Sequence, residues 1–145
     1  MPEKETLERA EEDKKEGKAP STQAGEFVRE EIEHVREGKH GARSTKQAIA
    51  IGLSKARRAG VKLQPPKKGS KKTQKQAARD LKKGKKKSAK KSAKRSRATS
   101  RALKREGHSA ASKRALSRQA RSAAKKRSAA SRSRSAKKAA KTRKK

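Results

Sequence analysis

The scarcity and placement of large apolar side chains most constrain what this chain can fold into. Nine of them lie between residues 27 and 63, namely Phe27, Val28, Ile32, Val35, Ile49, Ile51, Leu53, Val61 and Leu63. Residues 64–145 contain only Leu81, Leu103 and Leu116. A segment of about 40 residues is near the lower limit for independent folding without disulfides or a metal. The sequence therefore predicts one small, marginally stable folded unit in the middle of the chain.

The ionisable residues divide the chain in a second way. The protein has 48 Lys and Arg against 14 Asp and Glu, a formal net charge of +34. Residues 1–37 hold 12 acids against 7 bases, whereas residues 38–145 hold 41 bases against Asp80 and Glu106. An acidic head on a strongly basic body is typical of proteins that bind nucleic acid or another polyanion.

Together, these patterns predict a mostly disordered chain with α-helical segments. The expected domains are an acidic N-terminal segment over residues 1–20, a central helical hairpin over residues 21–63 and a Lys/Ala/Ser/Arg-rich, low-complexity tail over residues 64–145. Repulsion among the tail cations favours an extended and mobile chain because little apolar surface opposes it. Since Ala and Lys have high helix propensity, we expect a coil-to-helix change when phosphates neutralise the tail.

The first helix of the hairpin is expected over residues 23–37. Its apolar side chains recur at helical spacing on Val28, Ile32 and Val35. Ser21 or Thr22 is a candidate N-cap, and Gly38 is placed to end the helix. In the head, residues 3–16 favour a separate solvated helix that ends at Gly17. The alternative is that the acids of the head contact the tail and weaken its grip on a polyanion.

The second helix of the hairpin has signals at both ends. Ser44 and Gln47 have the spacing of a capping box, and Gly60 is placed for a left-handed C-terminal cap. One face is expected to carry Ile49, Leu53 and Ala56. We also expect Val61 to pack back onto this helix, beyond its end.

Residues 46–60 read KQAIAIGLSKARRAG and resemble the signature KQAIAIALSEARKAG of an uncharacterised family of small, very basic bacterial proteins. Gly52 and Lys55 depart from that signature, which has Ala and Glu there. The resemblance implies a bacterial origin and a helical module, but no reaction. In composition the tail resembles the C-terminal domain of linker histone and the bacterial histone-like proteins, which implies condensation of DNA by charge neutralisation.

The sequence favours a histone-like, nucleoid-associated protein that binds duplex DNA without sequence specificity. Its affinity would come from neutralised phosphates releasing condensed cations, so many cations would act together. The expected DNA-binding residues are Lys71, Lys72, Lys75, Lys82, Lys83, Lys85, Lys86, Lys87, Lys90, Lys91, Lys94, Arg95, Arg97, Arg101, Arg105, Arg114, Arg118 and Arg121. Phe27, the one aromatic residue, is expected to be buried, so base stacking is not expected to contribute.

Two alternatives stay open. An RNA- or ribosome-associated basic protein would use the same electrostatics. An interaction module would instead bind a protein partner, or a second copy of the chain, through the central hairpin.

We expect no catalysis, cofactor or metal. The chain has no cysteine, and no serine lies in a G-x-S-x-G motif. His34, His40 and His108 are the only histidines, and for His34, on the first central helix, a solvated histidine is favoured over a metal site or proton shuttle. Gln47 to Ser54, the longest stretch without a charge, is far too short to span a bilayer, so we expect no membrane partner and a cytoplasmic, nucleoid location.

Overall fold

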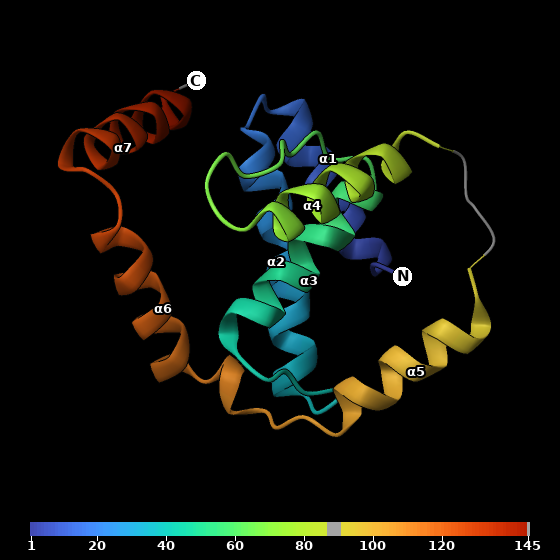
Figure 1. The fold of residues 1–145 in the computed structure, drawn as a ribbon. Coiled ribbons are helices and arrows are strands. Elements are labelled where there is room, and N and C mark those ends of the chain that lie inside the picture. Colours follow the sequence, from blue (N-terminus) through green and yellow to red (C-terminus); the bar gives the residue numbers. More distant parts are fainter. Residues whose placement is uncertain (87–90, 145) are drawn as a thin grey trace.

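The computed structural model describes residues 1–86 and 91–144, which form seven α-helices and one short 3-10 turn, without a strand among them (Figure 1). In chain order the elements are α1 (Lys4–Lys15), α2 (Pro20–Arg36), α3 (Thr45–Arg58), α4 (Lys71–Gly84), α5 (Ala93–Lys104), η1 (Ser109–Ala111), α6 (Lys113–Lys125) and α7 (Ala129–Arg143). Figure 1 shows α1 to α4 gathered at the centre and α5, α6 and α7 following one another in an arc around them. We call these groups the inner module and the outer helices.

The prediction of a mostly disordered chain is wrong, and so is that of an extended, mobile tail. One reason is a set of serine caps that our sequence analysis missed. Each helix from α4 to α7 begins after a serine whose hydroxyl accepts a hydrogen bond from the backbone N–H three residues on, namely Ser70, Ser92, Ser112 and Ser128. Such a cap contributes about 1 kcal/mol, and Ala, Lys and Arg continue the helix well. The structure shows these segments as helices, so the coil from which the expected coil-to-helix change would start is not found.

The hairpin of α2 and α3 is confirmed, with a shifted start. α2 begins at Pro20, because proline is well suited to the first turn of a helix, and neither Ser21 nor Thr22 caps it. Gly38 follows the end of α2 with a φ of 76°. At α3, the Ser44 hydroxyl accepts from the N–H of Gln47 at 3.2 Å, as the capping box predicts.

The C-terminal end of α3 also agrees with the prediction. Gly60 has a φ of 104°, a conformation that favours glycine. The N–H of Gly60 donates to the carbonyl of Arg57 at 3.2 Å, and that of Val61 donates to the carbonyl of Ala56 at 3.1 Å. This pair of bonds defines a Schellman motif. Val61 is buried in the same apolar cluster as Ala56, so the expected contact beyond the helix end forms.

α2 and α3 cross through small side chains. The buried face of α3 consists of Ala48, Gly52 and Ala56, together with residues at its two ends. Ile49 and Leu53, which the sequence placed on the core face, are only partly buried. A Cβ on Gly52 would lie 2.6 Å from the Cα of Val28, so the two backbones touch here. Packing therefore requires the glycine, although it costs about 1 kcal/mol of helix propensity relative to Ala.

α1 confirms the helix predicted in the acidic head, but it is not a free solvated helix. It packs against α2 and buries Thr6, Ala10 and Asp13. Ala10 joins an apolar cluster that includes Ala24 and Phe27, whose side chain is 1% exposed. The head is thus part of the inner module. None of the helices in the described ranges is long and apolar enough to cross a membrane.

Candidate nucleic-acid interface

α4 carries its cations on the side turned away from α3. They are Lys71, Lys72, Lys75, Arg79, Lys82 and Lys83, and all are exposed. At about 100° per residue, these side chains fall within roughly 120° of the helix circumference. Ala77 and Asp80, on the other side, are buried. The result is one continuous cationic face along the helix, which we call the α4 stripe.

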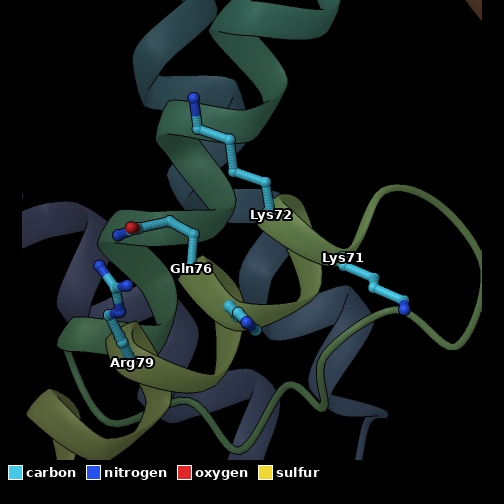
Figure 2. A pocket seen from close by; sticks show the side chains of 5 residues that line it. Lys71, Lys72, Gln76 and Arg79 are labelled. Carbon is cyan, nitrogen blue, oxygen red and sulfur yellow. The ribbon is translucent and has the colours of Figure 1, made fainter.

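Part of the α4 stripe borders a shallow hollow of about 340 Å³, lined by Lys71, Lys72, Lys75, Gln76 and Arg79 (Figure 2). Figure 2 shows Lys72, Gln76 and Arg79 projecting from one side of α4, while Lys71 points away from them near the start of the helix. Because four of the five lining residues are Lys or Arg, the hollow suits an anion such as a phosphate group.

A buried carboxylate fixes α4 on α3. Asp80, 1% exposed, accepts hydrogen bonds from Ser54 Oγ at 2.7 Å and from Arg58 Nε at 2.8 Å. Burial raises the pKa of the Asp80 carboxyl, but the hydrogen bonds from Ser54 and Arg58 and the charge of Arg58 outweigh burial and leave this pKa below its ordinary value. Near the end of α4, a Cβ on Gly84 would collide with the carbonyl oxygen of Arg57. These contacts determine which face of α4 is left for solvent.

α5 and α6 repeat the segregation of charge. On α5, the stripe comprises Lys94, Arg97, Arg101, Lys104 and the following Arg105, within roughly 100° of the helix circumference. On α6, Arg114, Arg118, Arg121 and Lys125 fall within roughly 60°. A second hollow of about 410 Å³ is lined by Arg118, Arg121, Ser122, Lys125 and Lys126. α7 differs, because Arg132 and Arg143 lie on the side opposite its other cations.

The backbone between α5 and α6 attaches the outer helices to the inner module. We call residues 106–112 the docking segment. The N–H of Gly41, in the loop between α2 and α3, donates to the carbonyl of Leu103 at 2.9 Å, and the N–H of Ala42 donates to the carbonyl of Gly107 at 3.0 Å. A Cβ on Gly41 would collide with the backbone of the docking segment. The loop and the segment therefore meet backbone to backbone.

Side chains of the inner module complete this attachment. Arg36 Nε donates to the carbonyl of Ala111 at 2.8 Å, and the buried Thr45 Oγ1 donates to the carbonyl of Ala110 at 2.6 Å. Ala110 and Ala111 are both buried in an apolar cluster with the C-terminal part of α2. Leu116 of α6 packs against the same cluster. The docking segment thus holds α5 and α6 at one end of the inner module.

The structure distributes the predicted DNA-binding residues over three helices. On α4 lie Lys71, Lys72, Lys75, Lys82 and Lys83; on or at the end of α5 lie Lys94, Arg95, Arg97, Arg101 and Arg105; and on α6 lie Arg114, Arg118 and Arg121. Lys85, Lys86 and Lys91 are exposed between α4 and α5, and Lys87 and Lys90 lie outside the described residues. Arg95 falls outside the α5 stripe.

Three cations that were not predicted from the sequence complete the stripes, namely Arg79, Lys104 and Lys125. Each lies three or four residues from a predicted contact, since Arg79 follows Lys75 by four and Lys125 follows Arg121 by four. Helical spacing alone could have identified them, had the tail been expected to be helical.

Residues 4–68 match the model of DUF6496, a family of unknown function. The matched region covers α1, α2, α3 and the loop that follows, and it ends before the α4 stripe. No curated protein matches the chain. No solved structure matches it either. Over residues 4–68, the chain is similar to an uncharacterised family.

Proposed function

We propose that this protein binds duplex DNA without sequence specificity, as a histone-like, nucleoid-associated protein. The observation that carries the proposal is the arrangement of the cations. On α4, α5 and α6 most of the cations lie on one exposed stripe, with Arg95 and Lys113 outside it, and the opposite faces of α4 and α6 hold Asp80, Ala77 and Leu116. Helices that need one face for packing present the other to a polyanion.

The dimensions of a stripe suit a phosphate backbone. From Lys71 to Lys83 the α4 stripe rises about 18 Å, at about 1.5 Å per residue. Over that length one strand of a duplex presents about five phosphates and both strands about ten, against the six cations of the stripe. Most cations of the stripe can therefore neutralise a phosphate and release a condensed counterion. The gain is entropic and does not depend on the base sequence.

The structure offers little with which to read bases. Phe27 is the single aromatic residue of the chain, and it is buried among α1, α2 and α3. Stacking platforms of the kind that single-strand and RNA-recognition modules use need exposed aromatic rings. Contacts to phosphates remain, and they position a protein on DNA without specifying sequence.

The test is a set of binding isotherms on unrelated duplexes at several salt concentrations. The affinity should be similar across sequences, and log K should fall steeply and linearly with log salt. Competition by structured RNA at equal nucleotide concentration should displace the protein less well than duplex DNA does. An affinity indifferent to salt, or a thousandfold preference for one sequence, would refute the proposal, and tighter binding to RNA would reassign it to that partner.

Variants of the α4 stripe test its part in this binding. Replacing Lys75, Arg79 and Lys82 by Ala should reduce the slope of log K against log salt by about 2.7, since each lost phosphate contact contributes about 0.9. The matched control replaces Lys4, Lys14 and Lys15 of α1 by Ala, which removes the same charge from the acidic head. The control should change the slope far less. Equal changes in both variants would show that only net charge matters and not the stripe.

A further inference from the structure

Three side chains with metal-ligand chemistry meet near the C-terminal end of α2. Glu31 and His34 lie one turn apart on α2, and His40 follows in the loop after Gly38. One ligand atom from each of the three lies within 4.8 Å of the other two. The Glu31 side chain is 1% exposed, and those of His34 and His40 are 13% and 16% exposed. The cluster is thus largely withdrawn from water.

The hydrogen bonds of His40 aim one ring nitrogen at Glu31. His40 Nδ1 lies 3.0 Å from the carbonyl oxygen of Gly41, which can only accept, so Nδ1 carries a hydrogen. His40 Nε2 lies 3.0 Å from Glu31 Oε1, a second acceptor. A neutral imidazole has only one N–H, so Nε2 can meet this oxygen through a second proton or through a metal ion. Metal-binding histidines are commonly oriented in this way, with the second nitrogen donating to a backbone carbonyl.

Carboxylates outnumber ammonium groups around the cluster. Glu3 and Glu30 approach His34, with Glu3 Oε1 at 3.0 Å and Glu30 Oε1 at 3.9 Å from Nε2. Lys39 and Lys55 pair with these carboxylates and with Glu31, so three acids meet two ammonium groups. Within a chain of net charge +34, this is a local concentration of carboxylates.

Lys55 pairs with only one of the two carboxylate oxygens of Glu31. Its Nζ lies 2.6 Å from Glu31 Oε2, for which residues 1–86 and 91–144 supply no other partner, and 3.5 Å from Glu30 Oε1. Oε1 of Glu31 is left to face His40 and the interior of the cluster. The ammonium group therefore orients the carboxylate without occupying the ligand oxygen.

We propose that Glu31, His34 and His40 form a binding site for a divalent transition-metal ion, with Zn²⁺ as the preferred ion. Two imidazole nitrogens and one carboxylate oxygen suit Zn²⁺ or Co²⁺, whereas Mg²⁺ and Ca²⁺ prefer all-oxygen sites. Five residues separate the two histidines, a spacing that zinc sites use. Ligands of a tetrahedral zinc ion lie roughly 3.4 Å apart, so small side-chain movements would close the site. A fourth position remains for water or for Glu3.

Such an ion would join α2 to the loop that holds the outer helices. His40 immediately precedes Gly41 and Ala42, whose N–H groups bind the backbone of Leu103 and Gly107. Metal binding would thus order the loop residues Gly41 and Ala42, to which the docking segment is attached. The inference stands on the geometry of the cluster and is independent of DNA binding.

Calorimetric titration of the chelator-treated, full-length protein with ZnCl₂ tests the proposal, with CoCl₂ as a spectroscopic probe. The wild type should bind one Zn²⁺, show the intense visible absorption of tetrahedral Co²⁺, and melt at a higher temperature when Zn²⁺ is present. His34→Ala and His40→Ala should each weaken Zn²⁺ binding by roughly tenfold or more, since even second-shell changes have effects of that size.

Two matched control variants each remove a side chain of the same type as a proposed ligand, but from outside the cluster. His108→Ala removes the third histidine, and Glu33→Gln removes a carboxylate of α2 outside the cluster. Both should keep wild-type affinity for Zn²⁺ and the Co²⁺ spectrum. Circular dichroism without metal establishes that each variant is folded, and the nearly isosteric Glu31→Gln replaces any histidine variant that is not. The proposal is overturned if the wild type binds no Zn²⁺, or if cluster and control variants lose affinity equally.

Discussion

The inner module and the outer helices are equally helical, yet different interactions account for them. In the inner module, Phe27 and Val35 are almost completely buried, and helices touch at the backbone of Gly52 and Gly84. α5, α6 and α7 bury no residue at all. Their helices depend on composition and serine caps, and the docking segment positions them. In this molecule, helix formation and helix placement therefore have separate physical sources.

The largest expected effect is the loss of the backbone contact between α2 and α3. Gly52→Ala would place a methyl group 2.6 Å from the Cα of Val28. We expect a loss of about 3 kcal/mol in the free energy of unfolding from overpacking, against a gain of about 1 kcal/mol in helix propensity. Denaturant unfolding followed by circular dichroism measures the difference.

Gly25→Ala is the matched control for this substitution. Gly25 also lies inside a helix, α2, but nothing approaches within 4 Å of its would-be Cβ. Alanine there should raise the free energy of unfolding by about 1 kcal/mol. If both glycine variants were stabilised, the close crossing of α2 and α3 would be wrong.

The next largest effect is expected when the carboxylate of Asp80, which attaches α4 to α3, is removed. Asp80→Asn keeps the shape but removes the charge that Arg58 and Ser54 bind. At neutral pH we expect a loss of about 2 kcal/mol in the free energy of unfolding. Glu33→Gln, which breaks an exposed pair with Arg29, should lose less than about 0.5 kcal/mol.

The pH dependence of this difference has a definite sign. The pKa of Asp80 is lower in the folded protein than its ordinary value of 3.8. The ionised carboxylate therefore stabilises the fold above pH 3.8, and this contribution is lost as the pH falls through the folded pKa. The gap between wild type and Asp80→Asn should be widest near neutral pH and should shrink in acid. A gap that stayed constant would mean that the charge of Asp80 contributes nothing.

The sequence predicts the inner module better than the outer helices. Apolar spacing and the signals at Ser44, Gln47 and Gly60 predict the hairpin, because these are local rules. The buried face of α3 is centred on Gly52 and not on the predicted Ile49 and Leu53. The spacing of apolar side chains does not show where two helix backbones touch. The prediction of a disordered tail over residues 64–145 was wrong because it took a low content of large apolar side chains to mean disorder. Serine caps and an alanine-rich backbone need no large core to form helices.

The anchors of α4 and of the outer helices could not be predicted for another reason. Asp80 is one of only two acids in residues 38–145, but its partners Ser54 and Arg58 are distant in sequence. Ala110 and Ala111 are two alanines among many, and only the tertiary fold gives them a role. Most cations of the candidate interface were named from the sequence and stay a prediction, and their grouping into stripes required knowing that the segments are helices.

A smaller effect is expected where the docking segment meets the inner module. Thr45→Val removes the hydroxyl that donates to the carbonyl of Ala110 at 2.6 Å. An unsatisfied buried carbonyl costs about 1 to 2 kcal/mol. We expect faster amide hydrogen exchange in residues 106–112 and α6, with little change in α2. Thr99→Val is the matched control, because its hydroxyl bonds only within α5, and it should leave the docking segment unchanged. Equal acceleration in α2 would show that both regions unfold together.

The smallest effect separates helix formation from helix placement most directly. Ser44 and Ser128 make the same capping bond, at 3.2 Å in each case, one in the packed α3 and one in the unpacked α7. Replacing either by Ala removes about 1 kcal/mol of helix stability. In Ser44→Ala, tertiary contacts couple α3 to the whole inner module, so the midpoint of denaturant unfolding should fall while the helical signal in water stays unchanged. In Ser128→Ala the reverse should hold, because α7 frays by itself and its loss of helical signal leaves the unfolding midpoint in place. If both variants shifted the midpoint equally, α7 would be part of the cooperative fold, and the separation between inner module and outer helices would not stand.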